Sequence, residues 1–196
     1  MLRKQRIEAR DGGWILYLED FLPAAEADGF FTQLRAQVPW EQFRNRLWTF
    51  PRLTAFTADT GVVYRYSGVT HSGVGWTSPL LAIRERVEHA AEAPFNGVLL
   101  NLYRDGNDSM GRHADAEPEL GQNPLVASVS LGAVRTFVLR HNDGHEKIGF
   151  DLAHGSLLVM GGTLQHHWKH ELPKTKHPVG ERINLTFRHF HRAEEF

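Results

Sequence analysis

The sequence contains no cysteine and no long apolar run. Without cysteine among its 196 residues, the chain has neither disulfides nor thiolate metal ligands, which fits a reducing compartment. No segment approaches the roughly 20 apolar residues that a membrane-spanning helix needs. The N-terminal stretch MLRKQRIEARDGG also lacks the apolar core of a signal peptide. We therefore expect an intracellular protein that is not associated with a membrane.

The sequence also lacks an excess of charge of either sign. Its formal net charge is -1 and its pI is about 6.9, so the strongly basic field that is usual for a nucleic-acid binder is absent. Any such binding must use a local patch. One candidate is FRNRLWTFPR (43–52), which contains three arginines, three aromatic residues and no acidic residue. The alternative is an irregular surface segment that happens to be rich in arginine.

The composition is that of a folded globular protein. Hydrophobic residues make up 41% of the chain and charged residues 23%, which is ordinary for one soluble domain spanning residues 1–196. Helical periodicity is seen at 23–39 and at 78–93, and in the latter Leu81, Ile83 and Val87 are core candidates together with Ala90 or Ala91. Short strands are expected at 14–21, 62–68, 97–104, 125–132, 135–141, 147–153, 155–161 and 182–190. Helices followed by a run of strands favour an α+β fold with a closed or sandwich-like β core.

The last of these strands, ERINLTFRHF (181–190), has an unusual polar face. Arg182, Asn184, Thr186 and Arg188 occupy every second position, so all four side chains point to one side of an extended chain. The intervening Ile183, Leu185 and Phe187 form an apolar face. The polar row is either a solvated edge or a surface built to hold a ligand.

Histidine and aspartate occur in patterns that suit a metal ion. His113 and Asp115 are two residues apart in GRHADAE, so both point to one side of an extended segment. The stretch QHHWKHELP (165–173) adds three histidines, His166, His167 and His170. Two histidines and one carboxylate form the facial triad of non-haem Fe(II) oxygenases. From this region alone, a set of surface histidines on a polar loop is the favoured reading.

Three longer motifs resemble the AlkB family of Fe(II)/2-oxoglutarate-dependent dioxygenases, and most closely its DNA-repair branch. NLYRDGNDSMGRHADAE (101–117) is similar to the signature N-x-Y-x-D-G-x-D-x-x-G-x-H-x-D-x-E. RINLTFR (182–188) resembles R-x-N-x-T-x-R, and HGSLLVMGGTLQHHWKHELP (154–173) resembles the segment between them. The fold that the resemblance implies is a double-stranded β-helix (jelly roll) core, with the N-terminal helices packed on its outside.

The resemblance also implies a set of ligands. His113, Asp115 and His170 match the iron ligands, whereas His167 matches a histidine before tryptophan that does not bind the iron, and His166 has no counterpart. The positions that match contacts to 2-oxoglutarate are Asn101, Tyr103, Arg182, Asn184 and Arg188. In this reading the polar row of the last strand faces the barrel interior, where arginine can pair with a carboxylate through two parallel hydrogen bonds.

The chemistry implied is oxidative removal of an alkyl group from a base such as 1-methyladenine or 3-methylcytosine, with Fe(II), 2-oxoglutarate and O2. Enzymes of this kind extrude the target base into a pocket. Tyr66 matches the stacking aromatic, Tyr64 lines the same region, and Glu117 matches the acid that contacts the exocyclic group of the base. We expect Phe43, Arg44, Arg46 and Arg52 to contact the nucleic acid.

Two features differ from the duplex-binding members of the family. The hairpin HNDGHEK (141–147) is short and not basic. The wedge segment of the family has an aromatic residue at its tip, whereas FRNRLW (43–48) offers Phe43 or Leu47 with arginines between them. Both leave single-stranded DNA and RNA open as substrates. We expect a monomer in the cytoplasm, associated with the nucleoid in a bacterium, or in the nucleus of a eukaryote. The alternatives are a 2-oxoglutarate-dependent hydroxylase acting on a protein or small molecule, and a non-catalytic jelly-roll binding module.

Overall fold

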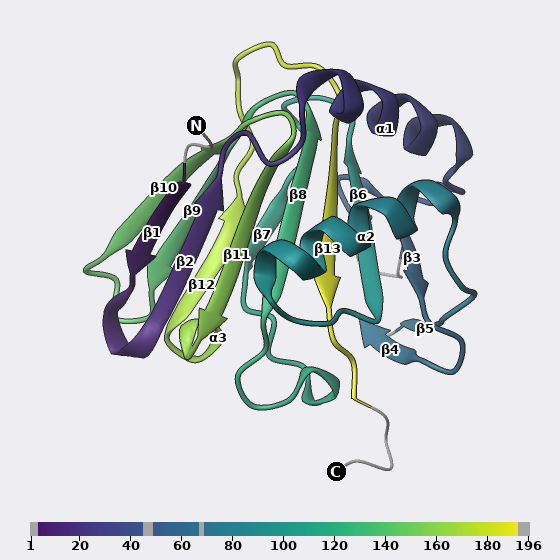
Figure 1. Ribbon diagram of the computed structural model, residues 1–196. Coiled ribbons are helices and arrows are strands. Elements are labelled where there is room, and N and C mark those ends of the chain that lie inside the picture. The colour runs from purple at the N-terminus through teal and green to yellow at the C-terminus, as the bar shows by residue number, and fades with distance from the viewer. Residues whose placement is uncertain (1–3, 45–48, 67–68, 192–196) are drawn as a thin grey trace.

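Two antiparallel β-sheets packed face to face form the centre of the protein, seen in the computed structural model, which describes residues 4–44, 49–66 and 69–191 (Figure 1). The larger sheet consists of β1 (Lys4–Glu8), β2 (Gly13–Leu18), β3 (Leu53–Ala58), β6 (Gly97–Tyr103), β8 (Val126–Gly132), β11 (Ser156–Gly162) and β13 (Arg182–Arg188). The smaller sheet consists of β7 (Met110–His113), β9 (Arg135–His141), β10 (Lys147–Leu152) and β12 (Trp168–Leu172). A separate hairpin is formed by β4 (Val63–Tyr66) and β5 (Val69–Ser72).

The strand order confirms the expected jelly-roll core. It is β1-β2-β11-β8-β13-β6-β3 in the larger sheet and β10-β9-β12-β7 in the smaller one, so most neighbours in space are distant in sequence. One end of the space between the sheets is filled by apolar side chains from both, among them Ile15, Met160, Leu139 and Trp168. The other end is lined by polar side chains and contains the candidate site.

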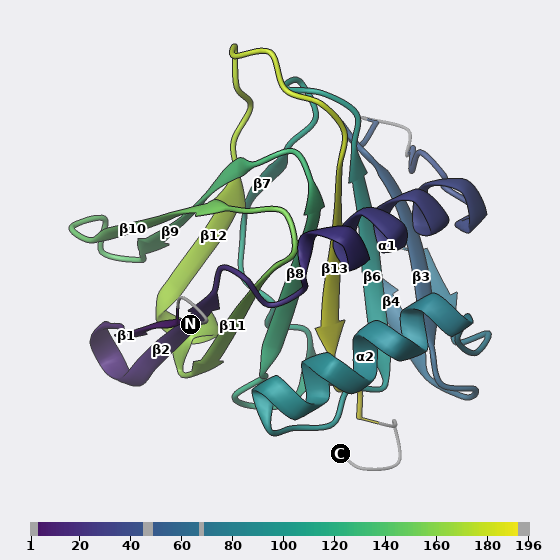
Figure 2. The same cartoon turned by 45° about the horizontal axis from the view of Figure 1, so that its top comes forward.

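Two helices cover the outer face of the larger sheet, as expected: α1 (Ala24–Gln37) and α2 (Ser78–Ala91) (Figures 1 and 2). In α2 the buried residues are Leu80, Ile83 and Val87, spaced three and four apart along one face. The prediction that Leu81 belongs to the core was wrong. Leu81 is 40% exposed, because one residue beyond Leu80 the helix has turned by about 100° toward solvent.

The two faces of β13 point in the directions that the resemblance implied, the apolar face toward the helices and the polar face toward the smaller sheet. Ile183, Leu185 and Phe187 are fully buried in the core between the larger sheet and the helices. The polar row on the other face of β13 lines the space between the two sheets and is almost excluded from solvent. The short elements that complete the fold are η1 (Arg10–Gly12), η2 (Pro118–Leu120) and α3 (Leu164–His167). None of the helices in the described part of the chain is long and apolar enough to cross a membrane.

Candidate active site

Two neighbouring strands of the smaller sheet bring the histidine–aspartate pair together with His170. His113 ends β7, His170 lies opposite it in β12, and Asp115 follows β7 by two residues. The ligand-type atoms of the three residues all lie within 4.8 Å of one another. Asp115 Oδ1 is 3.9 Å from His113 Nε2, and Asp115 Oδ2 is 3.8 Å from His170 Nε2. His166 and His167 are not part of this group.

The surroundings of the triad orient its side chains. The Nδ1 atom of His113 lies 2.9 Å from the carbonyl oxygen of Gly111, which leaves Nε2 directed at the cluster. The backbone N–H of Asp115 donates to Oε1 of Gln165 at 2.9 Å. Asp115 and His170 are buried, whereas His113 is partly exposed at the mouth of the site. The cluster is therefore accessible from solvent on the side where His113 lies.

The buried polar row of β13 begins beside the triad. Arg188 donates from Nη2 to Oδ1 of Asp115 at 2.8 Å, and Arg182, at the other end of the strand, donates to the hydroxyl of Ser130 at 2.9 Å. Between them, Asn184 donates to the hydroxyl of Ser128 at 2.7 Å. Two serines of β8 thus fix the side chains of Arg182 and Asn184.

Several buried polar atoms of this site have no partner among the described residues. They are Oδ2 of Asp115, Nε of Arg182, and Nε and Nη1 of Arg188. A buried donor or acceptor without a partner is unfavourable by about 1–3 kcal/mol, and more if it is charged. One vacant carboxylate oxygen next to two imidazoles fits a divalent cation, and three vacant guanidinium N–H groups fit a small carboxylate ligand.

The charges of the site set the protonation states that metal binding requires. Burial raises the pKa of Asp115, but the Arg188 guanidinium and the two imidazoles outweigh it, so that the pKa falls to about 2. Burial, followed by the repulsion from His113, lowers the pKa of His170 to about 3. At neutral pH the site therefore presents an ionised carboxylate and a neutral His170 imidazole, the forms that coordinate a metal.

Strand β6 supplies the side of the cavity next to β13. Asn101 pairs with Asn184 and Tyr103 with Arg182 in the ladder, and the Arg182 guanidinium lies 5.3 Å from the centre of the Tyr103 ring.

The sequence did not predict a role for Arg135, which is buried and donates to the carbonyl oxygens of Asp105, Asp108 and Pro173. Nor did it predict roles for Ser128 and Ser130. Their signal was available, since two polar residues at alternate positions of VASVSLG mark a buried polar face.

Tyr64 lies deeper than expected for a residue that contacts a substrate. It is fully buried among Phe56, Phe190 and their neighbours, and its hydroxyl donates to Oε1 of Glu117 at 3.1 Å. Burial raises its pKa, so the hydroxyl remains protonated and a donor. The other carboxylate oxygen of Glu117 has no partner in the described part of the chain. The side chain of Tyr66 lies outside the described residues.

The segment 43–52 divides into an exposed and a buried part. Phe43 packs its ring 4.8 Å from that of Phe50, and Arg44 is exposed. Arg46 and Leu47 lie outside the described residues. The placement of Arg52 at the nucleic-acid surface was wrong: it is 2% exposed, because its guanidinium donates to Asn101 at 2.7 Å and lies over the Phe50 ring.

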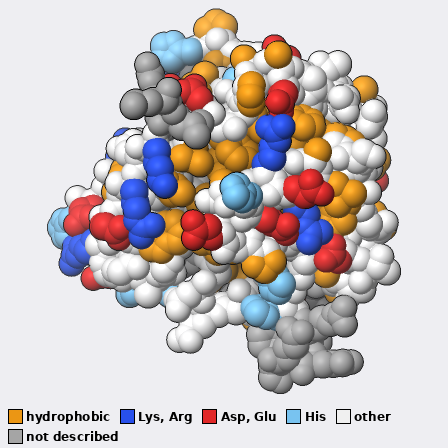
Figure 3. Space-filling model, in the orientation of Figure 1, with side chains coloured by type: hydrophobic (Ala, Val, Ile, Leu, Met, Phe, Trp, Pro, Cys, Tyr) orange, Lys and Arg blue, Asp and Glu red, His pale blue; other side chains and the backbone are white. Residues whose placement is uncertain are grey.

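Basic and acidic side chains alternate on the helix-covered face of the molecule. Figure 3 shows them interspersed there, with apolar side chains between them. The described atoms of this face form no continuous cationic surface.

Comparison with known proteins agrees with the geometry. Residues 15–188 match the family model described as the 2OG-Fe(II) oxygenase superfamily. The chain is 40% identical to the DNA oxidative demethylase ALKBH2 of Bos taurus and of Homo sapiens over 84% of its length, and the alignment spans 64% and 69% of those proteins. It is 39% identical to the alpha-ketoglutarate-dependent dioxygenase alkB homolog 3 of Bos taurus, over 86% of this chain and 63% of that protein.

A solved structure supports the fold. The structure of OsALKBH1 superposes with a TM-score of 0.68 at 17% sequence identity, over 94% of this chain and all of that one. A family model that covers most of the chain, relatives at this level of identity, and a His-Asp-His cluster inside a jelly roll lead to one assignment. The chain belongs to the 2OG-Fe(II) oxygenase superfamily and, within it, to the AlkB family.

Proposed function

We propose that this protein removes alkyl groups oxidatively from N-alkylated bases such as 1-methyladenine and 3-methylcytosine in DNA, with Fe(II), 2-oxoglutarate and O2. The observation that carries the proposal is the triad of His113, Asp115 and His170 beside two buried arginines whose N–H groups have vacant positions. The relatives named as DNA oxidative demethylases support the choice of substrate, although the chain matches about two thirds of their length.

The three residues of the triad would hold the iron. Two imidazoles and one carboxylate on one side of a cation leave its remaining positions open for other ligands. When bound, iron and 2-oxoglutarate supply the oxidation of the alkyl carbon by O2, after which the base is released from the hydroxylated carbon. Asp115 also accepts a hydrogen bond from Arg188, so the same guanidinium orients the metal-binding carboxylate and lines the cosubstrate cavity.

The polar row would hold 2-oxoglutarate, which has two carboxylates. Arg182 and Arg188 stand at the two ends of the row, each with an unused N–H, and the cavity between them is lined by Asn101, Tyr103 and Asn184. The guanidinium is planar and permanently charged, so it can accept one carboxylate in a fixed orientation. The hydrogen bonds to Ser128 and Ser130 fix the row before the ligand arrives.

The alkylated base would lie next to His113, the partly exposed member of the triad, with Tyr66 stacked on its other face. Glu117 would contact its exocyclic group through the carboxylate oxygen that has no protein partner among the described residues. A base alkylated at such a position is cationic, so a nearby carboxylate favours it over the normal base. The role of Tyr64 in this arrangement is to position Glu117, not to contact the base.

The nucleic acid would run over Phe43, Arg44 and Arg46, since Arg44 is exposed while Arg52 is not. The turn of the β9–β10 hairpin, Asn142–Glu146, contains no lysine or arginine, so it offers no basic loop for a second strand. We therefore place single-stranded DNA first among the substrates and treat RNA as a second one. The protein would act as a monomer in the compartment that contains the nucleic acid.

The decisive experiment incubates the protein with Fe(II), 2-oxoglutarate and a panel of methylated DNA and RNA oligonucleotides, and follows base masses by mass spectrometry. Loss of one methyl group from 1-methyladenine or 3-methylcytosine, absent in His113→Ala, supports the proposal. Succinate formation that no oligonucleotide stimulates would instead indicate a hydroxylase acting on a protein or small molecule. Absence of iron binding and of succinate would indicate a non-catalytic binding module.

A further inference from the structure

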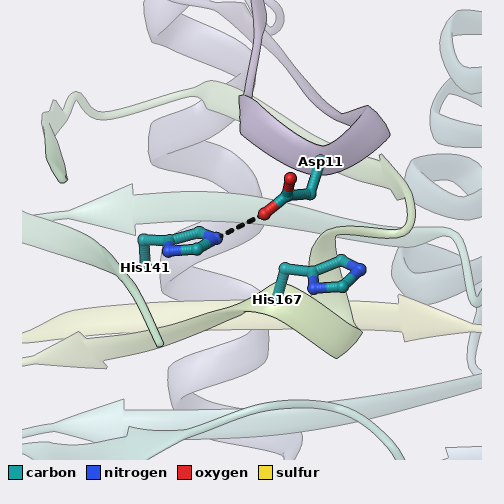
Figure 4. Close-up of side chains that lie close together, drawn as sticks. All are labelled: Asp11, His141 and His167. Carbon is teal, nitrogen blue, oxygen red and sulfur yellow. Dashed lines mark hydrogen bonds and ion pairs between the residues drawn. The ribbon is translucent and has the colours of Figure 1, made fainter. Parts of the chain in front are cut away.

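A second group of metal-ligating side chains lies apart from the triad. Asp11 of the turn η1, His141 at the end of β9 and His167 at the end of α3 come together near the start of β2 (Figure 4). Their ligand-type atoms all lie within 4.8 Å of one another. None of the three takes part in the chemistry proposed above.

Hydrogen bonds made by other groups hold the three segments together without relying on the three side chains. The backbone N–H of Asn142 donates to the carbonyl oxygen of His167 at 2.8 Å. The hydroxyl of Thr163 donates to the carbonyl oxygen of Asp11, and the indole N–H of Trp168 donates to that of Arg10 at 3.2 Å. Asp11 itself has a left-handed backbone, with φ of 63°, a conformation that is uncommon outside glycine. The backbone positions of the three residues are therefore fixed before any ion binds.

The ring of His141 lies between two carboxylates. Its Nδ1 is 2.8 Å from Oδ1 of Asp143, and its Nε2 is 2.8 Å from Oδ2 of Asp11. In metal sites the ring nitrogen that does not coordinate the ion usually donates to a carboxylate, which orients the ring and makes the other nitrogen more basic. The Asp143 carboxylate lies close enough to Nδ1 to accept in this way, although the backbone N–H of Asp143 also lies 3.3 Å from that nitrogen. The second oxygen of Asp143 is held by Arg10 at 2.6 Å. That arrangement leaves Nε2 for a cation shared with Asp11.

The charges around the group favour a divalent cation. Arg10 lies within 4 Å of three carboxylates, those of Asp11, Asp143 and Glu146. One guanidinium against three carboxylates leaves a local excess of negative charge when the imidazoles are neutral. The exposed side of the group is formed by the carboxylate of Asp11 and by the half-buried ring of His167, so an ion can enter from solvent.

We propose that Asp11, His141 and His167 bind a second divalent cation of the zinc type, with Asp143 orienting His141. Neutral imidazoles and a carboxylate are zinc ligands, and three protein ligands leave one position for water. Ligand atoms around a tetrahedral zinc stand about 3.3 Å apart, between the 2.8 Å and 4.8 Å found here. Small rotations of the Asp11 and His167 side chains bridge the difference. The ion would tie η1 and the β9–β10 hairpin to the start of β12, which carries His170.

The test uses a chain whose first site has been removed. His113→Ala combined with Asp115→Ala is incubated with zinc, dialysed, and analysed for metal and protein. We expect about one zinc per chain, and none when Asp11→Asn and His167→Gln are added. His166→Ala is the matched control: this neighbouring histidine contacts Gln122 and Asn123 outside the group and should leave zinc content unchanged. Asp143→Asn should weaken zinc binding by roughly 10- to 100-fold.

Cobalt gives a second readout in the chain with its triad intact. We expect two bound cobalt ions, one with the intense visible absorption of a tetrahedral site, and loss of that absorption with Asp11→Asn and His167→Gln. Circular dichroism confirms that each variant is folded. Failure of the folded triad-free chain to retain zinc would overturn the proposal and identify the group as ion pairs around a doubly protonated His141. Equal retention after Asp11→Asn and His167→Gln would overturn it as well.

Discussion

Arg182 and Arg188 differ in what their removal would do, although both line the cavity that we propose for the cosubstrate. Arg188 also donates to Asp115 of the triad, whereas Arg182 is bound to Ser130 and lies over Tyr103. Removing one partner of a buried charged pair costs about 3–5 kcal/mol, which is roughly a hundred- to a few-thousand-fold in affinity. Arg182→Ala should therefore raise the 2-oxoglutarate concentration needed for half-maximal succinate production by that factor and leave metal affinity nearly unchanged.

Arg182→Lys provides the matched control. A lysine retains the charge but cannot reproduce the guanidinium fork, so it should restore cosubstrate binding only in part. Arg188→Ala should weaken both cosubstrate and metal binding, because it deprives Asp115 of its cationic partner. Overlapping titration curves for the wild type, Arg182→Ala and Arg182→Lys would show that the cosubstrate does not bind at the polar row.

The hydroxyl of Tyr64 offers a test of how Glu117 is positioned. Tyr64→Phe keeps the ring in its apolar surroundings but removes the hydrogen bond to the carboxylate. A hydrogen bond to a charged group contributes about 1.5–3 kcal/mol, so kcat/KM for a methylated oligonucleotide should fall by roughly 10- to 100-fold. The 2-oxoglutarate requirement should not change. Phe56→Leu, in the same cluster, controls for packing, and an equal decrease there would remove the case for the hydrogen bond.

The low pKa of His170 makes a prediction about acid stability. Burial lowers this pKa from 6.5 to about 3, so between these values the unfolded chain binds a proton at His170 that the folded chain does not. The free energy of unfolding of the metal-free protein should therefore fall as the pH falls from 6.5 toward 3, by up to about 1.4 kcal/mol per pH unit from this residue. Denaturant titrations at several pH values measure the slope. In His170→Gln the slope should be smaller by up to about 1.4 kcal/mol per pH unit, which corresponds to one proton. An unchanged slope would show that the pKa of His170 is not lowered in the folded protein.

At the scale of elements, the strands with strong periodicity were predictable from sequence. Both long helices and eight of the strands lie where alternation, helical spacing and turn residues placed them, with boundaries shifted by a few residues. β9 begins and ends at the expected residues. The alternation in β13 predicted one polar and one apolar face, but by itself it left a solvated edge and an interior site open, and the interior placement came from the family motifs.

The elements that the sequence did not reveal are short or have weak apolar patterns. β1, with the sequence KQRIE, is an exposed edge strand whose composition is typical of a loop. In β12, with the sequence WKHEL, buried and more exposed side chains alternate as in a strand. The segment has only five residues, and a polar histidine occupies one of its buried positions, so its sequence did not predict a strand. The pairing of β7 with β12 is a contact between distant segments, and local patterns cannot predict it. For this reason the triad could be assigned only through the family motifs, and the burial of Arg52 and Tyr64 could not be foreseen.

The turn after β8 is an element whose geometry requires glycine. Gly132 has φ of 88°, and a Cβ there would collide with the carbonyl oxygen of Glu181. It also pairs with Arg182 in the ladder. Gly132→Ala should destabilise the protein by about 2 kcal/mol or more and weaken 2-oxoglutarate binding. Thermal unfolding measures the first effect and succinate titration the second.

Gly29, inside α1, is the matched control for this substitution. A Cβ at Gly29 meets no atom within 4 Å. Gly29→Ala should therefore stabilise the protein by about 0.5–1 kcal/mol, as expected for a helix interior. Equal effects of the two substitutions would show that the close approach at Gly132 is not tight in solution.

At the scale of the whole molecule, the near-neutral charge limits how nucleic acid can be bound. With a net charge of -1, attraction must come from a local patch, and Arg44 is its exposed member in the described part of 43–52. Arg44→Ala combined with Arg46→Ala should weaken oligonucleotide binding at all sequences. It should also reduce the slope of log affinity against log salt by roughly 1–2, because each arginine that no longer pairs with a phosphate accounts for about one unit. Arg86→Ala, on α2 and paired with Glu26, should leave the slope unchanged.

The near-neutral charge and the short turn between β9 and β10 also lead to an expectation about which strand state is preferred. A duplex must be held by contacts to both strands, and the hairpin between β9 and β10 offers only Asn142, Asp143, Gly144, His145 and Glu146 to the second strand. Base extrusion from a duplex also breaks pairing and stacking, which is unfavourable by a few kcal/mol and largely avoided in a single strand. Single-stranded methylated DNA should therefore be repaired at least as fast as the duplex of the same sequence. Initial rates on both forms, each at saturating 2-oxoglutarate, test this.

Replacing Asp143 and Glu146 would disturb the ion pairs with Arg10, so the informative variant is His145→Lys, which adds a positive charge at the hairpin and keeps those ion pairs. It should increase the duplex rate more than the single-strand rate. A strong duplex preference in the unmodified protein would mean that another surface binds the second strand.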